Sequence, residues 1–171
     1  MQASLHSPAA AAEPQPLERQ QVQEFITHSD EVDSDMPKPM SYQIERDKPV
    51  EAKEIESLRA AVGWEQLENK YDRILANSYA HFTVREDQQL LAFVNVISDG
   101  IDDAFLVDLI VHPSVQRRGL GRALVYAAVT ALRADGIKCI QVTFNPELES
   151  FYRDCGFHIF KAGIIDNDHL E

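Results

Sequence analysis

The distribution of apolar residues along the chain changes near residue 41. Large apolar residues are few and scattered over residues 1–40, whereas residues 41–171 contain a succession of periodic apolar runs. Residues 1–40 also hold seven acidic against two basic residues and are rich in Ala, Pro, Gln and Ser. A segment of this kind buries too little apolar surface to offset the entropy lost on ordering. We therefore predict a disordered acidic tail over residues 1–40 and a folded domain over residues 41–171.

The folded part is predicted to begin with one strand and two helices. The alternation over Tyr42–Glu45 is typical of a strand. A helix is expected to begin at Pro49 and to end at Gly63, because proline suits the first helical turn and glycine suits the residue after the last one. A second helix is expected to follow Trp64 and to run to about Ala76.

Three strands and a longer helix are predicted next. Strand-like runs at residues 80–85, 89–97 and 104–111 are joined by short turns, which predicts an antiparallel meander. The third run, AFLVDLIV, is almost continuously apolar, so we expect it to be buried on both faces, with Asp108 as its one charged residue. Leucine and alanine at four-residue spacing predict a helix over residues 119–134.

The C-terminal part is predicted to hold a strand at residues 138–144, a short helix at 146–154 and a final strand at 157–165. A strand–helix–strand unit favours a parallel pair with a right-handed crossover. The chain is therefore expected to adopt an α/β (α+β) fold. Its mixed sheet joins an antiparallel meander to a parallel strand pair, and about four helices flank the sheet.

Composition narrows the class of protein. The formal net charge of −12 argues against nucleic acid as a partner, because phosphate backbones bind basic surfaces. No run approaches the ~18–20 apolar residues that cross a bilayer, and the first residues lack the pattern of a secretory signal. Cys139 and Cys155 are expected to be free, packed thiols in a reducing, cytoplasmic compartment. No spacing of Cys and His residues predicts a metal site.

One segment combines a strand end, glycines and arginines. Gln116, Gly119 and Gly121 form a Gln-x-x-Gly-x-Gly pattern at the start of the long helix. Glycines let backbone N–H groups approach a ligand closely, and the first N–H groups of a helix have no internal partner. Residues 109–134 contain no acid, although acids make up 28 of the 171 residues. The segment therefore predicts a phosphate or pyrophosphate site. Its local positive charge comes from Arg117, Arg118 and Arg122.

This pattern alone leaves alternatives open. The dinucleotide fingerprint Gly-x-Gly-x-x-Gly is incomplete, because Leu124 occupies the position of the third glycine, and the Gly-Lys-Ser/Thr of a Walker loop is missing. The glycines can also serve only to pack a helix against a strand. A protein that binds ATP or NAD through this turn is a competing hypothesis.

Two motifs, in this order, resemble those of the GNAT superfamily of N-acetyltransferases. Val111-His112-Pro113, followed by Gln-Arg-Arg-Gly-Leu-Gly-Arg-Ala-Leu, is similar to the superfamily's acyl-CoA-binding motif. Residues 145–157 are similar to its Asn-x-x-Ala-x-x-x-Tyr-x-x-x-Gly-Phe motif, with Leu148 in place of the common small residue. The resemblance covers about residues 41–165.

A resemblance to one subgroup rests on shorter stretches. Gly63-Trp64, Asn77-Ser78 and Ser98-Asp99-Gly100 are similar to sequences of bacterial and plastid members, some of which acetylate proteins or arylalkylamines. The resemblance implies transfer of an acetyl group from acetyl-CoA directly to a primary amine of a small molecule, a protein lysine or a protein N-terminus. It implies no metal, and a monomer or homodimer. A non-catalytic acyl-CoA-binding regulatory module is the alternative.

The resemblance also assigns roles to residues. Family members splay the two parallel strands to admit the pantetheine arm, and here its partners would be Leu109, Ile110, Val111 and Asn145. The pyrophosphate would lie on the turn formed by Gln116, Arg117, Arg118, Gly119, Leu120, Gly121 and Arg122.

Two side chains are candidate catalytic residues. Tyr152 is placed near the sulfur by the resemblance; a phenol of pKa ~10 is a weaker acid than a thiol of ~8.5, so we expect a hydrogen bond to sulfur rather than full proton transfer. Asp108 is the ionisable group of the buried strand, and burial is expected to raise its pKa. It is therefore a candidate general base, or a residue that only orients the substrate.

Overall fold

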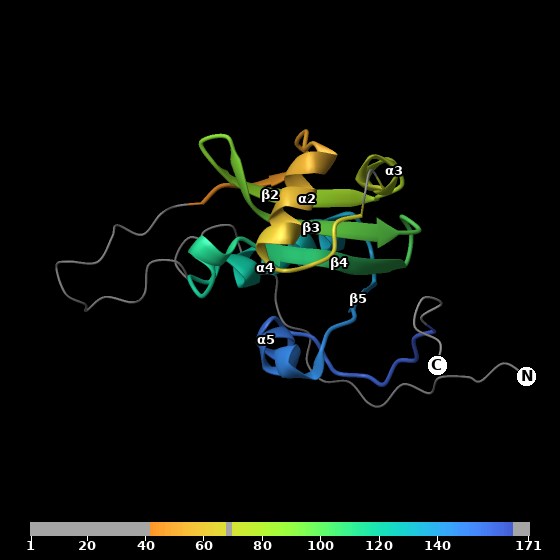
Figure 1. Ribbon diagram of the computed structural model, residues 1–171. Helices are drawn as coiled ribbons and strands as arrows, with labels where there is room; N and C mark the ends of the chain where they lie inside the picture. The colour runs from red at the N-terminus through yellow and green to blue at the C-terminus, as the bar shows by residue number, and fades with distance from the viewer. Residues whose placement is uncertain (1–41, 68–69, 166–171) are drawn as a thin grey trace, which may run out of the picture. The chain divides into compact units, whose positions relative to one another are not determined.

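Five strands form one mixed sheet in the order β1-β2-β3-β4-β5 (Figure 1). The computed structural model describes residues 42–67 and 70–165, so the tail predicted for residues 1–40 lies outside it. The first three pairings are antiparallel and β4 pairs with β5 in parallel, which confirms the predicted meander and parallel pair. The strands are β1 (Ile44–Arg46), β2 (Ala80–Glu86), β3 (Gln89–Ser98), β4 (Asp103–Val111) and β5 (Cys139–Val142).

Four α-helices are described, and the longest two cover opposite faces of the sheet (Figure 1). One core packs α4 against β2, β3 and β4, using the predicted leucine and alanine positions such as Leu124 and Leu132. A second core on the other face joins Ile55 and Leu58 of α2 to Tyr71 of α3 and Phe93 of β3. The helices are α2 (Ala52–Ala61), α3 (Tyr71–Ala76), α4 (Leu120–Ala134) and α5 (Glu149–Asp154).

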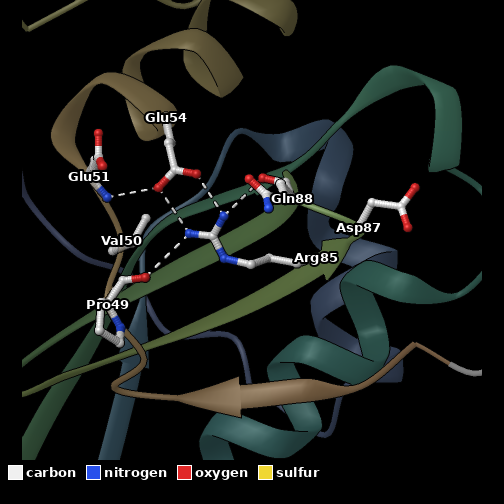
Figure 2. A pocket seen from close by; sticks show the side chains of 7 residues that line it. All are labelled: Pro49, Val50, Glu51, Glu54, Arg85, Asp87 and Gln88. Carbon is white, nitrogen blue, oxygen red and sulfur yellow. Dashed lines mark hydrogen bonds and ion pairs between the residues drawn. The ribbon is translucent and has the colours of Figure 1, made fainter.

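An ion pair anchors the start of α2 on the β2–β3 hairpin. Figure 2 shows the carboxylate of Glu54 facing the guanidinium of Arg85, whose two terminal nitrogens donate to it over 2.6 and 2.9 Å. The carbonyls of Pro49 and Gln88 accept further bonds from the same guanidinium, while Asp87 lies apart from the pair (Figure 2). The pair lies in an open hollow of about 420 Å³ and both charges are committed to each other. We assign it to stability.

The end of α2 fixes the direction of the chain that follows. Gly63 has a left-handed φ of 79°, and the N–H of Trp64 donates back to the carbonyl of Arg59 over 3.0 Å. Together with the bond from Gly63 to Ala60, this is a Schellman motif, and it confirms the predicted glycine terminus. The second helix was predicted to begin directly after Trp64, but it begins only at Tyr71. The reason is that Arg59 donates to the carbonyl of Glu65, which holds the chain out of a helix there.

Two further predictions were wrong. No strand is formed by residues 157–165: the sheet of the described residues ends at β5, and Phe160 and Ile165 are more than four-fifths exposed. Alternating apolar residues form a strand only when they pair with a neighbouring backbone, and residues 157–165 do not pair with the open edge of β5. Cys139 is exposed rather than packed, because β5 is the edge strand, whereas Cys155 is buried. Both cysteines are free, as predicted.

Candidate functional site

A pocket of about 340 Å³ lies where β4 and β5 separate. Their parallel ladder runs from Asp103 paired with Cys139 to Leu106 paired with Val142 and then stops, although β4 continues to Val111. One wall is therefore the second half of β4, and the other is the segment that follows β5. Tyr152 of α5 and Trp64 from the segment after α2 also line the pocket. The separation that the resemblance implied is present.

The bend in β4 is a β-bulge at Asp108. The pairing with β3 shifts register between Phe93 and Asn95, and Asp108 has a left-handed φ of 53°. A residue with a side chain in this conformation costs about 1–3 kcal/mol, so surrounding contacts must hold it there. A bulge leaves an extra residue unpaired and bends its strand. The bulge lies two residues beyond the last β4–β5 pair, and it accounts for the separation of the two strands.

Past the bulge, alternate residues of β4 present their backbones to the pocket. The N–H of His112 donates to the carbonyl of Leu91 in β3, so the residues at even positions face β3 and Val111 faces the opposite way. Accordingly, the carbonyl of Val111 accepts a bond of 2.8 Å from the side chain of Gln116. The backbones of Leu109 and Val111 thus face the gap. Ile110, which was predicted with them, directs its backbone to β3 and its side chain into the second core.

The glycine turn leaves a row of backbone amides without acceptors. Arg117 and Gly119 are both left-handed, with φ of 61° and 79°. Within residues 42–67 and 70–165, the amides of Arg117, Arg118 and Gly119 donate to no other group. The first three amides of α4, which belong to Leu120, Gly121 and Arg122, have no partner within the helix. Open amides of this kind suit an anion, and the phosphate site stays a prediction.

The three arginines of the turn differ in their partners. Arg122 donates to Asp154 of α5 over 2.8 Å. Neither Arg117 nor Arg118 forms an ion pair with the part of the chain that the structure describes, and both side chains are exposed. Of the three arginines in the turn, these two therefore have guanidinium groups that are free to bind an anion.

Tyr152 is held by aromatic rings, and its hydroxyl has no fixed partner. Its ring stacks on Phe144 with centroids 4.5 Å apart and meets Phe151 and Phe157 edge to face. Burial, followed by the neighbouring Cys155, raises the pKa of Tyr152 to about 12. No hydrogen bond joins this hydroxyl to any described residue, although the residue lines the pocket. It is a hydrogen-bond donor that keeps its proton at neutral pH.

Asn145 also lines the pocket, directly after β5. Its carbonyl accepts from Leu148 in the short 3₁₀ turn, but its side chain makes no capping bond. The side-chain amide is therefore available to a ligand, as the resemblance implied.

Asp108 lies in the pocket wall with both carboxylate oxygens bonded. Arg59 donates to one over 3.0 Å, and the hydroxyl of Tyr71 donates to the other over 2.7 Å. Burial, followed by the bond to Asp108, raises the pKa of Tyr71 well above its ordinary range. We call these three side chains the Asp108 cluster. Sequence analysis missed Arg59 and Tyr71; the signal was an acid inside an apolar strand, which requires a partner.

The histidines near the site have structural roles. His112 accepts from the amide of Ser114 at the start of a short 3₁₀ turn, and His81 bonds the carbonyl of Lys48 over 2.8 Å. Among the described residues no group of three or more His, Cys, Asp or Glu side chains could hold a metal ion. In the same part of the chain, no helix combines the length and apolar character needed to cross a membrane.

The sequence was compared with known families and proteins. The Acetyltransferase (GNAT) family model matches residues 39–157. An "Uncharacterized N-acetyltransferase ycf52" of the red alga Gracilaria tenuistipitata is 29% identical over 109 residues, which is 61% of this chain and 60% of the relative. "Serotonin N-acetyltransferase 2, chloroplastic" of rice is 39% identical over 67 residues, covering 39% of this chain and 34% of the rice protein. The chain thus matches less than two thirds of the length of these relatives.

Solved structures share the fold. A GNAT family acetyltransferase of Streptococcus pneumoniae superposes with a TM-score of 0.62 at 24% identity, covering 75% of this chain and 99% of that one. The family match includes β4, the glycine turn and the segment from Asn145 to Phe157, and with them every residue that lines the pocket. The chain belongs to the Acetyltransferase (GNAT) family.

Proposed function

We propose that the protein transfers an acetyl group from acetyl-CoA to a primary amine. The observation that carries the proposal is the pocket between β4 and β5, which Tyr152 lines, together with the open amides of the glycine turn that follows β4 in the chain. The turn suits a diphosphate, because its amides and two free arginines supply donors and positive charge. The gap suits an extended amide-bearing arm, because the backbones of Leu109 and Val111 can pair with it as a strand edge would.

Each group in the pocket has a role in this proposal. When bound, acetyl-CoA supplies an activated acyl group, and the neutral amine displaces its thiolate so that a C–N bond forms as the C–S bond breaks; the proton that the nitrogen loses passes through solvent to the thiolate, which leaves as the CoA thiol. The N–H of Val111 polarises the carbonyl oxygen. Tyr152 donates a hydrogen bond to the departing sulfur; its pKa of about 12 lies above that of a thiol, so the proton stays on the phenol. Asn145 binds the pantetheine arm of acetyl-CoA.

The pocket favours a monoamine with an apolar body as acceptor. Among the residues that the structure describes, Asp108 is the one charged residue that lines it, and its charge is offset by Arg59. The rest of the acceptor-facing wall includes Trp64 and Leu148, both more than two-fifths exposed. A polyamine would find no free carboxylate there, in spite of the net charge of −12. The similarity to a rice enzyme named for serotonin supports the same class.

Mass spectrometry of the products tests the proposal. The protein is incubated with isotope-labelled acetyl-CoA and a mixed library of aromatic monoamines, polyamines and lysine peptides. Labelled aromatic amides, formed ahead of the other products, are the expected result. Binding of CoA without turnover of any amine would favour the non-catalytic module, and affinity for ATP or NAD in preference to CoA would overturn both.

A further inference from the structure

The Asp108 cluster joins three elements that are distant in sequence. Arg59 lies in the last turn of α2, Tyr71 begins α3 and Asp108 forms the β4 bulge. Tyr71 is fully buried, and the side chains of Arg59 and Asp108 are 11% and 22% exposed. Arg59 and Tyr71 also contact each other over 3.2 Å. Each member therefore has two partners within the cluster, and the removal of one leaves the others with unmet hydrogen bonds.

Arg59 also contacts Trp64, which lines the same pocket. Its guanidinium lies 5.1 Å from the centroid of the Trp64 ring, and its Nε donates to the carbonyl of Glu65 over 2.8 Å. Its own carbonyl accepts the Trp64 N–H in the Schellman motif. One side chain thus connects the bulge that shapes β4 with an aromatic ring that lines the same pocket.

We infer that Arg59 and Tyr71 are positioning residues for acetyl transfer, which together with Asp108 fix the β4 bulge and Trp64. The inference rests on the proposed function. Both oxygens of Asp108 are committed to this cluster, so Asp108 acts by holding the pocket wall and is not the proton acceptor for the amine. Neither Arg59 nor Tyr71 needs to touch either substrate.

Two conservative variants test the positioning role. In Tyr71→Phe and Arg59→Lys, kcat/KM for the amine should fall about tenfold, because a small displacement of a substrate wall lowers the rate steeply, while the KM for acetyl-CoA stays within about twofold. The double variant should lose little more than either single variant, since the residues act as one unit. Matched controls are Tyr79→Phe and Arg73→Lys, which should behave as wild type. Full amine activity in both test variants would overturn the inference.

Trp64 is the single tryptophan of the chain, so its fluorescence reports its position without any assay of activity. Acrylamide should quench it more strongly in Tyr71→Phe and Arg59→Lys than in wild type and in the two controls. Equal quenching in all five proteins would overturn the link between the cluster and Trp64. If wild type transfers no acetyl group, the proposed function fails, and the quenching still decides whether the cluster fixes this wall.

The Asp108→Asn variant distinguishes a role in holding the pocket wall from a role in proton transfer. An amine of pKa ~10.4 is roughly one quarter neutral in solution at about pH 10 but less than about 0.1% neutral at about pH 7, so the loss of a general base should matter less at the higher pH. The ratio of wild-type to variant turnover is therefore expected to stay constant over this range if Asp108 only holds the wall. A ratio that falls toward one as the pH rises would show that Asp108 removes the proton, and would overturn this part of the inference.

Discussion

The two ends of the pocket differ in how their residues are distributed along the chain. At the proposed CoA end, the turn is formed by consecutive residues, Gln116 to Arg122, which run into the first turn of α4. At the acceptor end, Arg59 and Asp108 are 49 residues apart, and Tyr71 lies between them in sequence. The first end depends on backbone amides and local φ angles, and the second on side chains that only the packed sheet and helices bring together. Changes at the two ends should therefore alter different kinetic constants.

The largest effect is expected at Tyr152, which lies between the two ends. Tyr152→Phe keeps the ring packing and removes only the donor to sulfur, so kcat should fall by about 10²–10⁴-fold with CoA affinity nearly unchanged. Tyr126→Phe, whose hydroxyl makes only a long bond of 3.3 Å to the Asp154 carbonyl, is the control. Because the pKa of Tyr152 is about 12, ionisation of this group should cause no loss of activity below about pH 11. Unchanged turnover in Tyr152→Phe would remove Tyr152 from the mechanism.

A smaller effect is expected at the glycine turn. Gly119 and Gly136 have φ of 79° and 90°, and a Cβ atom at either position would meet nothing within 4 Å. Gly119→Ala and Gly136→Ala should thus lower the free energy of unfolding alike, by about 1 kcal/mol. Only Gly119→Ala should also weaken CoA binding, by about tenfold, because it displaces the amides that face the diphosphate. Calorimetric titration with CoA measures this; equal CoA affinity in the two variants would contradict the assigned turn.

Substitution of the arginines in the turn tests the contribution of side-chain charge at the same end. Arg117→Ala and Arg118→Ala should each weaken CoA binding about three- to tenfold, with less effect at high salt, because exposed charges are screened. Arg122→Ala should change it by less than about twofold, since that guanidinium is paired with Asp154. Titrations at low and high salt give the comparison. The reverse order among the three variants would show that the pair with Asp154 opens on binding.

The smallest effect concerns the anchor of α2, which supports the acceptor end from outside the pocket. The hydrogen bond from Arg85 lowers the pKa of Glu54 below its ordinary 4.5. A lowered carboxylate pKa stabilises the fold at higher pH, and this contribution is lost as the pH falls through the lowered pKa. Arg85→Met should therefore cost about 1 kcal/mol of unfolding free energy at pH 7, with the difference from wild type shrinking below about pH 4.5.

Denaturation by urea at about pH 7 and about pH 3 measures this difference. Arg153→Met, which breaks the exposed pair with Glu149 on α5, is the matched control and should cost less at both pH values. CoA affinity should not change in either variant at neutral pH. A pH-independent difference for Arg85→Met would mean that packing of the arginine stem, rather than its charge, stabilises this region.

Several elements could be predicted because their signals are local. The β4 run, the Gln-x-x-Gly-x-Gly turn and the spacing of leucines in α4 are adjacent in sequence. They predicted the parallel pair, which the structure confirms, and a phosphate site, which stays a prediction. The prediction of a strand at residues 157–165 was equally local and was wrong, because strand formation depends on a partner edge that the sequence pattern does not encode. The second helix was expected to follow Trp64 directly, but it begins only at Tyr71, and the carbonyl of Glu65 accepts a bond from the distant side chain of Arg59 instead.

The sequence by itself determined the family motifs, the mixed sheet and the chemistry available at the CoA end, because consecutive residues set backbone conformation and expose backbone amides. Only the tertiary structure decided that Asp108 would occupy a bulge and that Arg59 and Tyr71 would bond to its two oxygens. An apolar strand containing one acid requires a cationic or hydrogen-bonding partner, since an unpaired buried charge is costly. The packing of α2 and α3 on the sheet decides which side chains become these partners.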